Sequence, residues 1–248
     1  MKSFLTALPV FNEAPYVDAV LDQVANYSPQ VLVVDDGSSD GTAELLSRRS
    51  DIQLLTHPQN RGYGAALRSA FQYAAQQGFE YLVTIDCDGQ HEPQRIPSFV
   101  AACETTDIVS GSRYLEIFPE DSEPPAQRRW VNQQITAELN QRLGLQLSDA
   151  FCGFKAYRVD AVCSLHLDED GYAMPLQLWV QAAARELKIV EHPVPLIYLD
   201  ETRSFGGILD DARTRLEHYH EVIDKSVSSA LAEGLKIHRQ SYCRGETG

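Results

Sequence analysis

Short apolar runs alternate with longer amphipathic segments through the first half of the chain. The apolar runs predict strands at Phe4–Leu8, Gln30–Val34, Ile52–Leu55, Tyr81–Ile85 and Asp107–Ser110. Between them, helical spacing of apolar residues predicts helices at Glu13–Tyr27, 40–46, Gly64–Gln77 and 93–103. This alternation is typical of parallel strands joined by crossover helices. Since most of the runs are apolar throughout, we expect an α/β sheet that is covered on both faces.

The pattern changes after Tyr114. Phe118–Arg129 carries three prolines among acidic residues and is predicted to be a mobile loop. The elements predicted beyond it are a helix at Trp130–Leu143, a strand at Phe154–Tyr157, a helix at Tyr172–Leu187, one or two strands in Lys188–Leu199, and a long charged helix or helix pair at Ile208–Lys236. We therefore expect one domain over residues 1–207, followed by a helical C-terminal tail over residues 208–248.

Composition and charge narrow the possible functions. The 248 residues suffice for a large core, and the formal net charge of -14 opposes binding to nucleic acid over the average surface. The five cysteines are an odd number without a CxxC pair, so a disulfide framework or structural zinc site is not expected. The apolar N-terminus is interpreted as a first strand, and no apolar run reaches the ~20 residues of a membrane span. We expect a cytoplasmic protein without a transmembrane segment.

Polar motifs follow the predicted strands, where open α/β sheets bind their ligands. Pro9–Glu13 follows the first strand, and Val34–Thr42, with the pair Asp35-Asp36, follows the second. An acidic residue at a strand end is well placed to accept hydrogen bonds from a ribose or a base. The turn 60–66, with Gly62, opens a helix whose N-terminal amides can meet an anion, and Arg61 or Arg68 could add a charge.

The strongest motif is Asp86-Cys87-Asp88-Gly89-Gln90-His91, directly after the fourth strand. Two carboxylates in one cleft repel each other unless a cation joins them. Mg²⁺ or Mn²⁺ uses one or two carboxylates and completes its shell with water and phosphate oxygens. Such a metal would allow an acidic protein to hold a diphosphate.

In this order, the motifs resemble glycosyltransferase family 2, and within it the dolichyl-phosphate mannose synthase and polyprenyl-phosphate glycosyltransferase branch. The resemblance covers about 4–206 and includes 111–114, Asp149 and 153–158. It implies a GT-A, Rossmann-like, mostly parallel sheet flanked by helices, with a nucleotide-binding half (about 1–114) and an acceptor half (about 115–207). It also implies inverting transfer of a sugar from a nucleotide-diphosphate donor, a GDP- or UDP-sugar, to an acceptor that in relatives is a lipid phosphate.

The resemblance also implies roles for individual residues. The nucleoside pocket would be lined by Pro9, Phe11, Glu13 and Asp36. The metal and the donor diphosphate would be held by Asp86, Asp88 and Gln90. The acceptor would be approached by Arg113 and by Arg128 or Arg129, while Arg203 would close over the phosphates. We predict Asp149 to be a general base or an acceptor-orienting residue, with a helix or turn cap as the alternative.

Some residues depart from the family pattern. Gln177 stands where relatives that use polyprenyl phosphates usually carry Glu, and the ending after Arg203 is unlike the usual one. The polar tail could form a homodimer contact or cover the acceptor groove. A catalytically silent nucleotide-sugar-binding module stays open as an alternative function. A nucleotidyltransferase is a weaker one, because Pro9–Glu13 lacks the Gly-rich, basic character of those enzymes.

Overall fold

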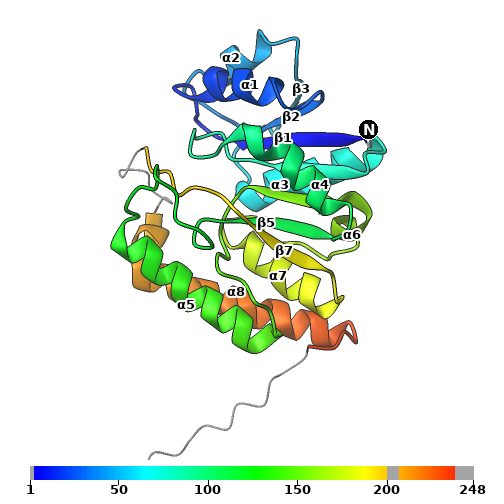
Figure 1. The fold of residues 1–248 in the computed structure, drawn as a ribbon, viewed down its shortest axis with the longest axis vertical. Helices are drawn as coiled ribbons and strands as arrows, with labels where there is room; N and C mark the ends of the chain where they lie inside the picture. Colours follow the sequence, from blue (N-terminus) through cyan, green and yellow to red (C-terminus); the bar gives the residue numbers. More distant parts are fainter. Residues whose placement is uncertain (1–2, 200–206, 238–248) are drawn as a thin grey trace, which may run out of the picture.

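A seven-stranded sheet forms the centre of the molecule (Figure 1). The computed structural model describes residues 3–199 and 207–237. The strands are β1 (Phe4–Val10), β2 (Val31–Asp35), β3 (Gln53–Thr56), β4 (Tyr81–Thr84), β5 (Ile108–Ser112), β6 (Lys155–Arg158) and β7 (Ile189–Pro193). Their order is β3-β2-β1-β4-β6-β5-β7. All neighbours pair parallel except β6, which runs antiparallel to β4 and β5, and the prediction of a mostly parallel sheet flanked by helices is confirmed.

Helices cover both faces of the sheet and divide the core into two apolar clusters. The side chains of α1 (Val17–Ala25), α2 (Thr42–Ser47) and α4 (Ile96–Cys103) belong to one cluster. The other cluster contains side chains of α3 (Tyr63–Gln76), α5 (Ala126–Leu143), α6 (Val159–Cys163), α7 (Met174–Ala184) and α8 (Ala212–Ala232). Two short 3₁₀ helices, η1 (Pro93–Arg95) and η2 (Gly207–Asp210), precede α4 and α8.

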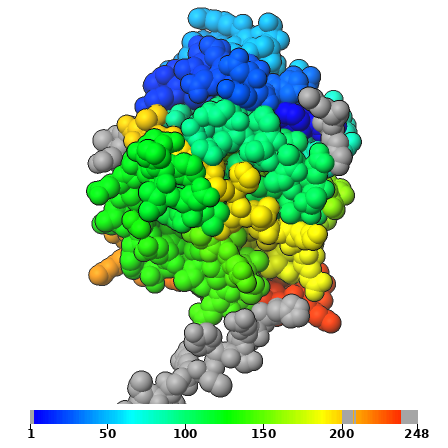
Figure 2. Space-filling model, in the orientation of Figure 1, coloured from blue at the N-terminus to red at the C-terminus, as the bar shows by residue number. Residues whose placement is uncertain are grey.

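The segment predicted to be a mobile loop through Arg129 ends earlier. Helix α5 already begins at Ala126, directly after Pro125. A proline is tolerated at a helix start because the first amides of a helix have no intrahelical partner. The preceding residues are tied down as well, because Asp121 accepts a hydrogen bond from the Leu196 amide at 2.7 Å. In Figure 2, the yellow chain that follows β7 fills the seam between the α4 and α5 regions.

The last helix is part of the domain's apolar core. Helix α8 lies along α5 and contacts α7, and its buried face includes Tyr219, Ile223 and Val227 (Figure 1). The side chain of Asp211 accepts a hydrogen bond from the Thr214 amide and so caps the helix N-terminus. Among residues 3–199 and 207–237, no helix combines the length and the apolar character that crossing a membrane requires.

The packing of α8 predicts a large loss of stability on truncation of Ile223. Its side chain is 0% exposed, so Ile223→Ala should lower the free energy of unfolding by about 2–4 kcal/mol in urea denaturation. Leu231 lies on the same helix and is 47% exposed, so Leu231→Ala should change it by less than about 0.5 kcal/mol. Equal, small effects of both substitutions would show that α8 does not contribute to the core.

Candidate active site

A cavity of about 740 Å³ opens at the carboxyl ends of β1, β2 and β4, where the sequence motifs gather. On the side of the N-terminal half it is lined by the predicted site residues Pro9, Phe11, Glu13, Asp36 and Gly62. Asp86, Asp88 and Gln90 line it after β4, and Arg113 and Arg128 reach it from β5 and α5. Ten of the predicted site residues therefore meet around one space, as expected where the strands of an open α/β sheet end.

Asp36 shapes the turn beneath the cavity. Its carboxylate accepts hydrogen bonds from the amides of Arg61 (3.0 Å) and Gly62 (2.7 Å), and lies 2.6 Å from His57 Nδ1. These contacts use three of the roughly four acceptor positions of a carboxylate. Gly62 has a φ of 103°, and an added Cβ would lie 2.3 Å from the Asp170 carbonyl, so only glycine fits this turn.

Two carboxylates, Asp86 and Asp88, line the cavity after β4. Asp86 accepts a hydrogen bond from the Tyr63 hydroxyl at 3.0 Å and lies 3.3 Å from His91 Nε2. Burial raises the pKa of Asp86, but the contacts with His91 and Tyr63 and the charge of Lys155 outweigh it, and the net shift is downward. The Asp86 side chain is 30% exposed, and Asp88 lines the same cavity.

A divalent metal fits this donor set. Two carboxylates, Asp86 and Asp88, line the cavity together with the amide side chain of Gln90. Within the described ranges, no group of three or more His, Cys, Asp or Glu side chains could hold a metal ion by itself. The protein thus offers one or two carboxylates, which suits Mg²⁺ or Mn²⁺ that also binds water and the oxygens of a diphosphate.

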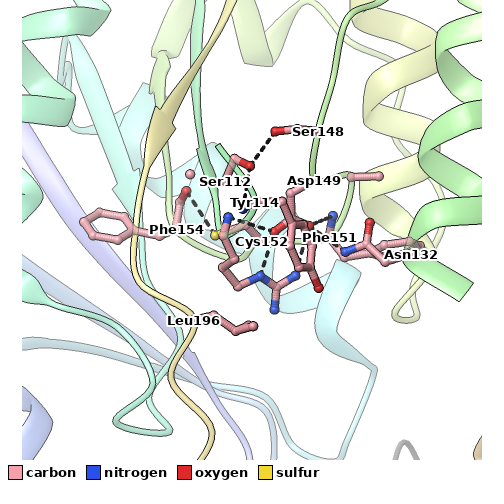
Figure 3. A network of polar contacts seen from close by, with 12 residues as sticks. Ser112, Tyr114, Asn132, Ser148, Asp149, Phe151, Cys152, Phe154 and Leu196 are labelled. Atoms are coloured by element: carbon pink, nitrogen blue, oxygen red, sulfur yellow. Dashed lines mark hydrogen bonds and ion pairs between the residues drawn. The ribbon is translucent and has the colours of Figure 1, made fainter. Parts of the chain in front are cut away.

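Arg113 is fixed by a buried carboxylate. Asp149 is 0% exposed and accepts hydrogen bonds from Arg113 Nε at 2.6 Å and Nη2 at 2.9 Å. Asn132 Nδ2 and the Phe151 amide donate to the same carboxylate (Figure 3). Burial raises the pKa of Asp149, but the charge and hydrogen bonds of Arg113 dominate and lower it to about 2. Asp149 does not line the cavity, so this geometry favours a residue that positions Arg113 and gives no support to a general base.

Other predicted residues lie outside the cavity wall. Arg68 donates to the Glu169 carbonyl at 2.6 Å and pairs with the Asp170 carboxylate, which joins α3 to the segment before α7. Arg129 is exposed, and its guanidinium lies 5.9 Å from the centre of the Tyr114 ring. Arg203 lies outside the described residues, so its predicted closure over the phosphates stays a prediction.

Gln177 fills a structural position beside the site. Its Oε1 accepts hydrogen bonds from the amides of Asp168 and Glu169, both at 2.9 Å, and its Nε2 donates to the Asp168 carboxylate at 2.6 Å. An ionised glutamate could accept from the two amides but could not donate to Asp168. A glutamate here would place a second negative charge beside Asp168.

Sequence analysis missed part of the cavity wall. Arg215 and Tyr219 reach it from α8, and Tyr63 and Tyr172 line it with their rings stacked at 5.7 Å. Arg215 lies in the ending that departs from the family pattern, and it belongs to no motif. Its one signal in the sequence was a cation at helical spacing from the apolar residues of the tail, which is also typical of a solvated face.

Comparisons with known proteins identify the family. The family model for "Glycosyl transferase family 2" matches residues 6–165. The chain belongs to this family. An undecaprenyl-phosphate mannosyltransferase of Micrococcus luteus is 30% identical over 84% of this chain and 90% of that protein. A polyprenol monophosphomannose synthase of Mycolicibacterium smegmatis is also 30% identical, over 77% of this chain and 76% of that protein. The predicted glycosyltransferase of the polyprenyl-phosphate branch is thereby confirmed.

Solved structures of other proteins resemble this chain and support its GT-A fold. Glucosyl-3-phosphoglycerate synthase from Mycobacterium tuberculosis, solved with phosphoglyceric acid, matches with a TM-score of 0.66 at 18% identity. The match covers 95% of this chain and 81% of that chain. S. aureus TarS 1-349 with UDP-GlcNAc matches with a TM-score of 0.63 at 15% identity, over 96% and 68% of the two chains. The predicted GT-A fold is thus confirmed.

The Arg113–Asp149 pair predicts a pH-dependent effect of Asp149→Asn. Removing the charge leaves a half-buried guanidinium without its anion, so stability at pH 7 should fall by about 3 kcal/mol or more. The pKa of Asp149 is about 2, below the ~3.9 of an unfolded chain. The stabilisation is therefore complete above about pH 4 and is lost as the pH falls towards 2. Urea denaturation should show the same gap to wild type at pH 7 and pH 5, and a gap that is reduced by about half at pH 3.

The control is Asp160→Asn, because Asp160 forms an exposed pair with Arg158 at 2.7 Å. Exposed pairs contribute little, so stability should change by less than about 1 kcal/mol at every pH. If Asp149→Asn also lowers the free energy of unfolding by less than about 1 kcal/mol at pH 7, the Arg113–Asp149 pair does not stabilise the fold as a buried pair should.

Close packing against Asp86 makes Gly153 a second test of the site. A Cβ at Gly153 would lie 2.0 Å from Asp86 Oδ2, so Gly153→Ala should displace the carboxylate. We expect nucleotide-sugar affinity in the presence of Mg²⁺, measured by calorimetry, to fall about tenfold or more, as for loss of a charged contact. The matched control is Gly171→Ala, whose Cβ would meet only the flexible end of Glu169 at 3.2 Å. Unchanged affinity of Gly153→Ala would mean that Asp86 does not contact the donor or its metal.

Proposed function

We propose that this glycosyltransferase moves a sugar from a nucleotide-diphosphate donor, a GDP- or UDP-sugar, to a polyprenyl phosphate, with inversion and with Mg²⁺ or Mn²⁺. The observation that carries the proposal is one cavity in which two carboxylates, Asp86 and Asp88, meet two arginines, Arg113 and Arg128. The carboxylates suit a metal-bound diphosphate, and the arginines suit a second phosphate. The names of the two 30% identical relatives, which contain undecaprenyl phosphate and polyprenol monophosphomannose, support the acceptor class.

The proposed chemistry assigns separate tasks to the two halves of the cavity. A bound divalent metal would withdraw electron density from the diphosphate and stabilise it as the leaving group. Asp86, Asp88 and Gln90 would orient the metal and the donor diphosphate. Arg113, fixed by Asp149, would hold the acceptor phosphate. An ionised phosphate is already a nucleophile and needs no general base. This agrees with the complete burial of Asp149.

The test begins with thermal unfolding in the presence of a panel of GDP- and UDP-sugars, with and without Mg²⁺ or Mn²⁺. A donor at ~100 times its dissociation constant should stabilise the fold by roughly 2.7 kcal/mol. Transfer from that donor to a short-chain polyprenyl phosphate is then followed by product mass, and NMR of the product gives the anomeric configuration. Stabilisation without transfer or donor hydrolysis would support the silent nucleotide-sugar-binding module instead.

Asp88→Asn tests the proposed metal role directly. The substitution removes one negative charge and keeps the size of the side chain, so donor affinity should fall at least tenfold with Mg²⁺ and change little without it. Calorimetry with and without the metal measures both values. A donor affinity that is equal to wild type in Mg²⁺ would contradict the metal role of Asp88.

Two finer predictions remain proposals. A cytoplasmic location is to be tested by fractionation of cells that produce the protein. A homodimer through the C-terminal tail is to be tested by sedimentation, although α8 already packs its apolar face on α5 and α7 of its own chain.

A further inference from the structure

Two arginines from distant parts of the chain line the same cavity. Arg128 comes from the first turn of α5, and Arg215 comes from the first turn of α8. Arg215 is 4% exposed, and its Nη1 donates to the Leu209 carbonyl at 2.7 Å. Burial of a guanidinium is costly unless it is paired with hydrogen-bond acceptors or anions. The Leu209 carbonyl is one such acceptor, and Arg215 lies in the wall of the cavity.

The positive charge of Arg128 acts on the Arg215 guanidinium. Burial lowers the pKa of Arg215, and the positive charge of Arg128 lowers it further, while Tyr219, Asp210 and Asp211 oppose the shift. Arginine nevertheless stays protonated in proteins, so the wall of the cavity carries two positive charges here. Two guanidiniums in one cavity wall suit an anionic ligand.

The residues around the two arginines come from the part of the chain after β5. Tyr219 of α8 packs on Phe151 with ring centres 5.1 Å apart, and both residues line the cavity with Arg128 and Arg215. The helices that carry the two arginines, α5 and α8, contact each other. By contrast, the carboxylates after β4 and the turn at Gly62 belong to the N-terminal half.

We propose that Arg215 of the C-terminal helix, together with Arg128, binds the phosphate group of the acceptor. The proposal rests on the proposed function and adds a residue to it that lies beyond the part of the chain matched by the family model. A phosphate monoester carries about −1.5 to −2 charges at pH 7 and offers three acceptor oxygens, which two planar guanidiniums can bind from two sides. The C-terminal helix is thereby part of the acceptor site.

Two kinds of molecule carry this phosphate. One is a polyprenyl phosphate, and the other is a small water-soluble phosphate ester such as phosphoglyceric acid, which is bound in a solved structure of the same fold. Arg215 would contact the group that the two share. The experiment therefore uses both, as a short-chain isoprenyl phosphate and as phosphoglyceric acid, with the isoprenyl alcohol as a probe that lacks the phosphate.

The key variants are Arg215→Met, which removes the charge and keeps most of the buried stem, and Arg215→Lys, which keeps the charge but not the planar fork. The matched control is Arg213→Ala, an exposed arginine of the same helix that does not line the cavity. Binding of each probe is measured by calorimetry in the presence of Mg²⁺ and of the nucleotide-sugar that stabilises the wild type. Thermal unfolding checks that each variant is folded.

We expect wild type and Arg213→Ala to bind at least one of the two esters with equal affinity. Arg215→Met should weaken that binding about 10- to 100-fold, since it loses hydrogen bonds to a charged group, and Arg215→Lys should lie between. Affinity for the nucleotide-sugar and for the isoprenyl alcohol should change less than about twofold. If Arg215→Met weakens binding of the isoprenyl phosphate alone, the acceptor is a lipid phosphate. If it weakens binding of phosphoglyceric acid alone, the acceptor is a water-soluble ester.

Several results would overturn the inference. Binding of both esters by Arg215→Met as tightly as by Arg213→Ala would reduce Arg215 to a cap of η2 through the Leu209 carbonyl. If Arg215→Met lowers the affinity for the nucleotide-sugar alone, Arg215 contacts the donor and not the acceptor. If the wild type binds neither ester, the cavity has no acceptor phosphate site. If Arg215→Met does not fold, equal ester binding by Arg215→Lys and wild type contradicts the role. The proposed function fails separately, when the wild type binds an ester through Arg215 but transfers no sugar.

Discussion

The buried ion pair between Asp149 and Arg113 is the interaction on which the cavity wall after β5 depends. It ties together the end of β5, helix α5 through Asn132, and the loop before β6 through the Phe151 amide (Figure 3). The loop is also tied to β7, because Glu191 accepts hydrogen bonds from the amides of Ser148 and Asp149. A buried pair is stable only when its remaining hydrogen-bonding positions are filled. The contacts around Asp149 meet that condition and fix Arg113 at the cavity wall.

Asp86, after β4, is held in a different way. It is partly open to the cavity, and it is oriented by the Tyr63 hydroxyl, by His91 at 3.3 Å and by close approach of Gly153. The two carboxylates therefore differ: Asp149 is fully buried and paired with Arg113, whereas the Asp86 side chain is 30% exposed at the cavity.

Local patterns predicted the strands and the gathering of motifs at their ends, because apolar runs and strand-end turns are encoded by neighbouring residues. The antiparallel direction of β6 was beyond such patterns, since pairing partners such as Val83 and Ala156 are far apart in sequence. Asp149 was found from its motif, but its complete burial depends on contacts with α5 and β5. The same holds for Arg68, whose partners at Glu169 and Asp170 lie about a hundred residues away. Arg215 acquires its place in the cavity only through the packing of α8.

Gln177 shows how a departure from the family pattern can be absorbed by its surroundings. The residue does not line the cavity, and its amide fixes the segment at Asp168 and Glu169. The carbonyls that follow this anchor lie where a Cβ at Gly62 or Gly64 would collide with them, so the segment packs directly on the turn that Asp36 shapes. An acid at position 177 would repel Asp168 and loosen the packing of this segment on the turn at Gly62. Glutamine here therefore belongs with Asp168 as a matched pair, and it gives no reason to expect a loss of activity.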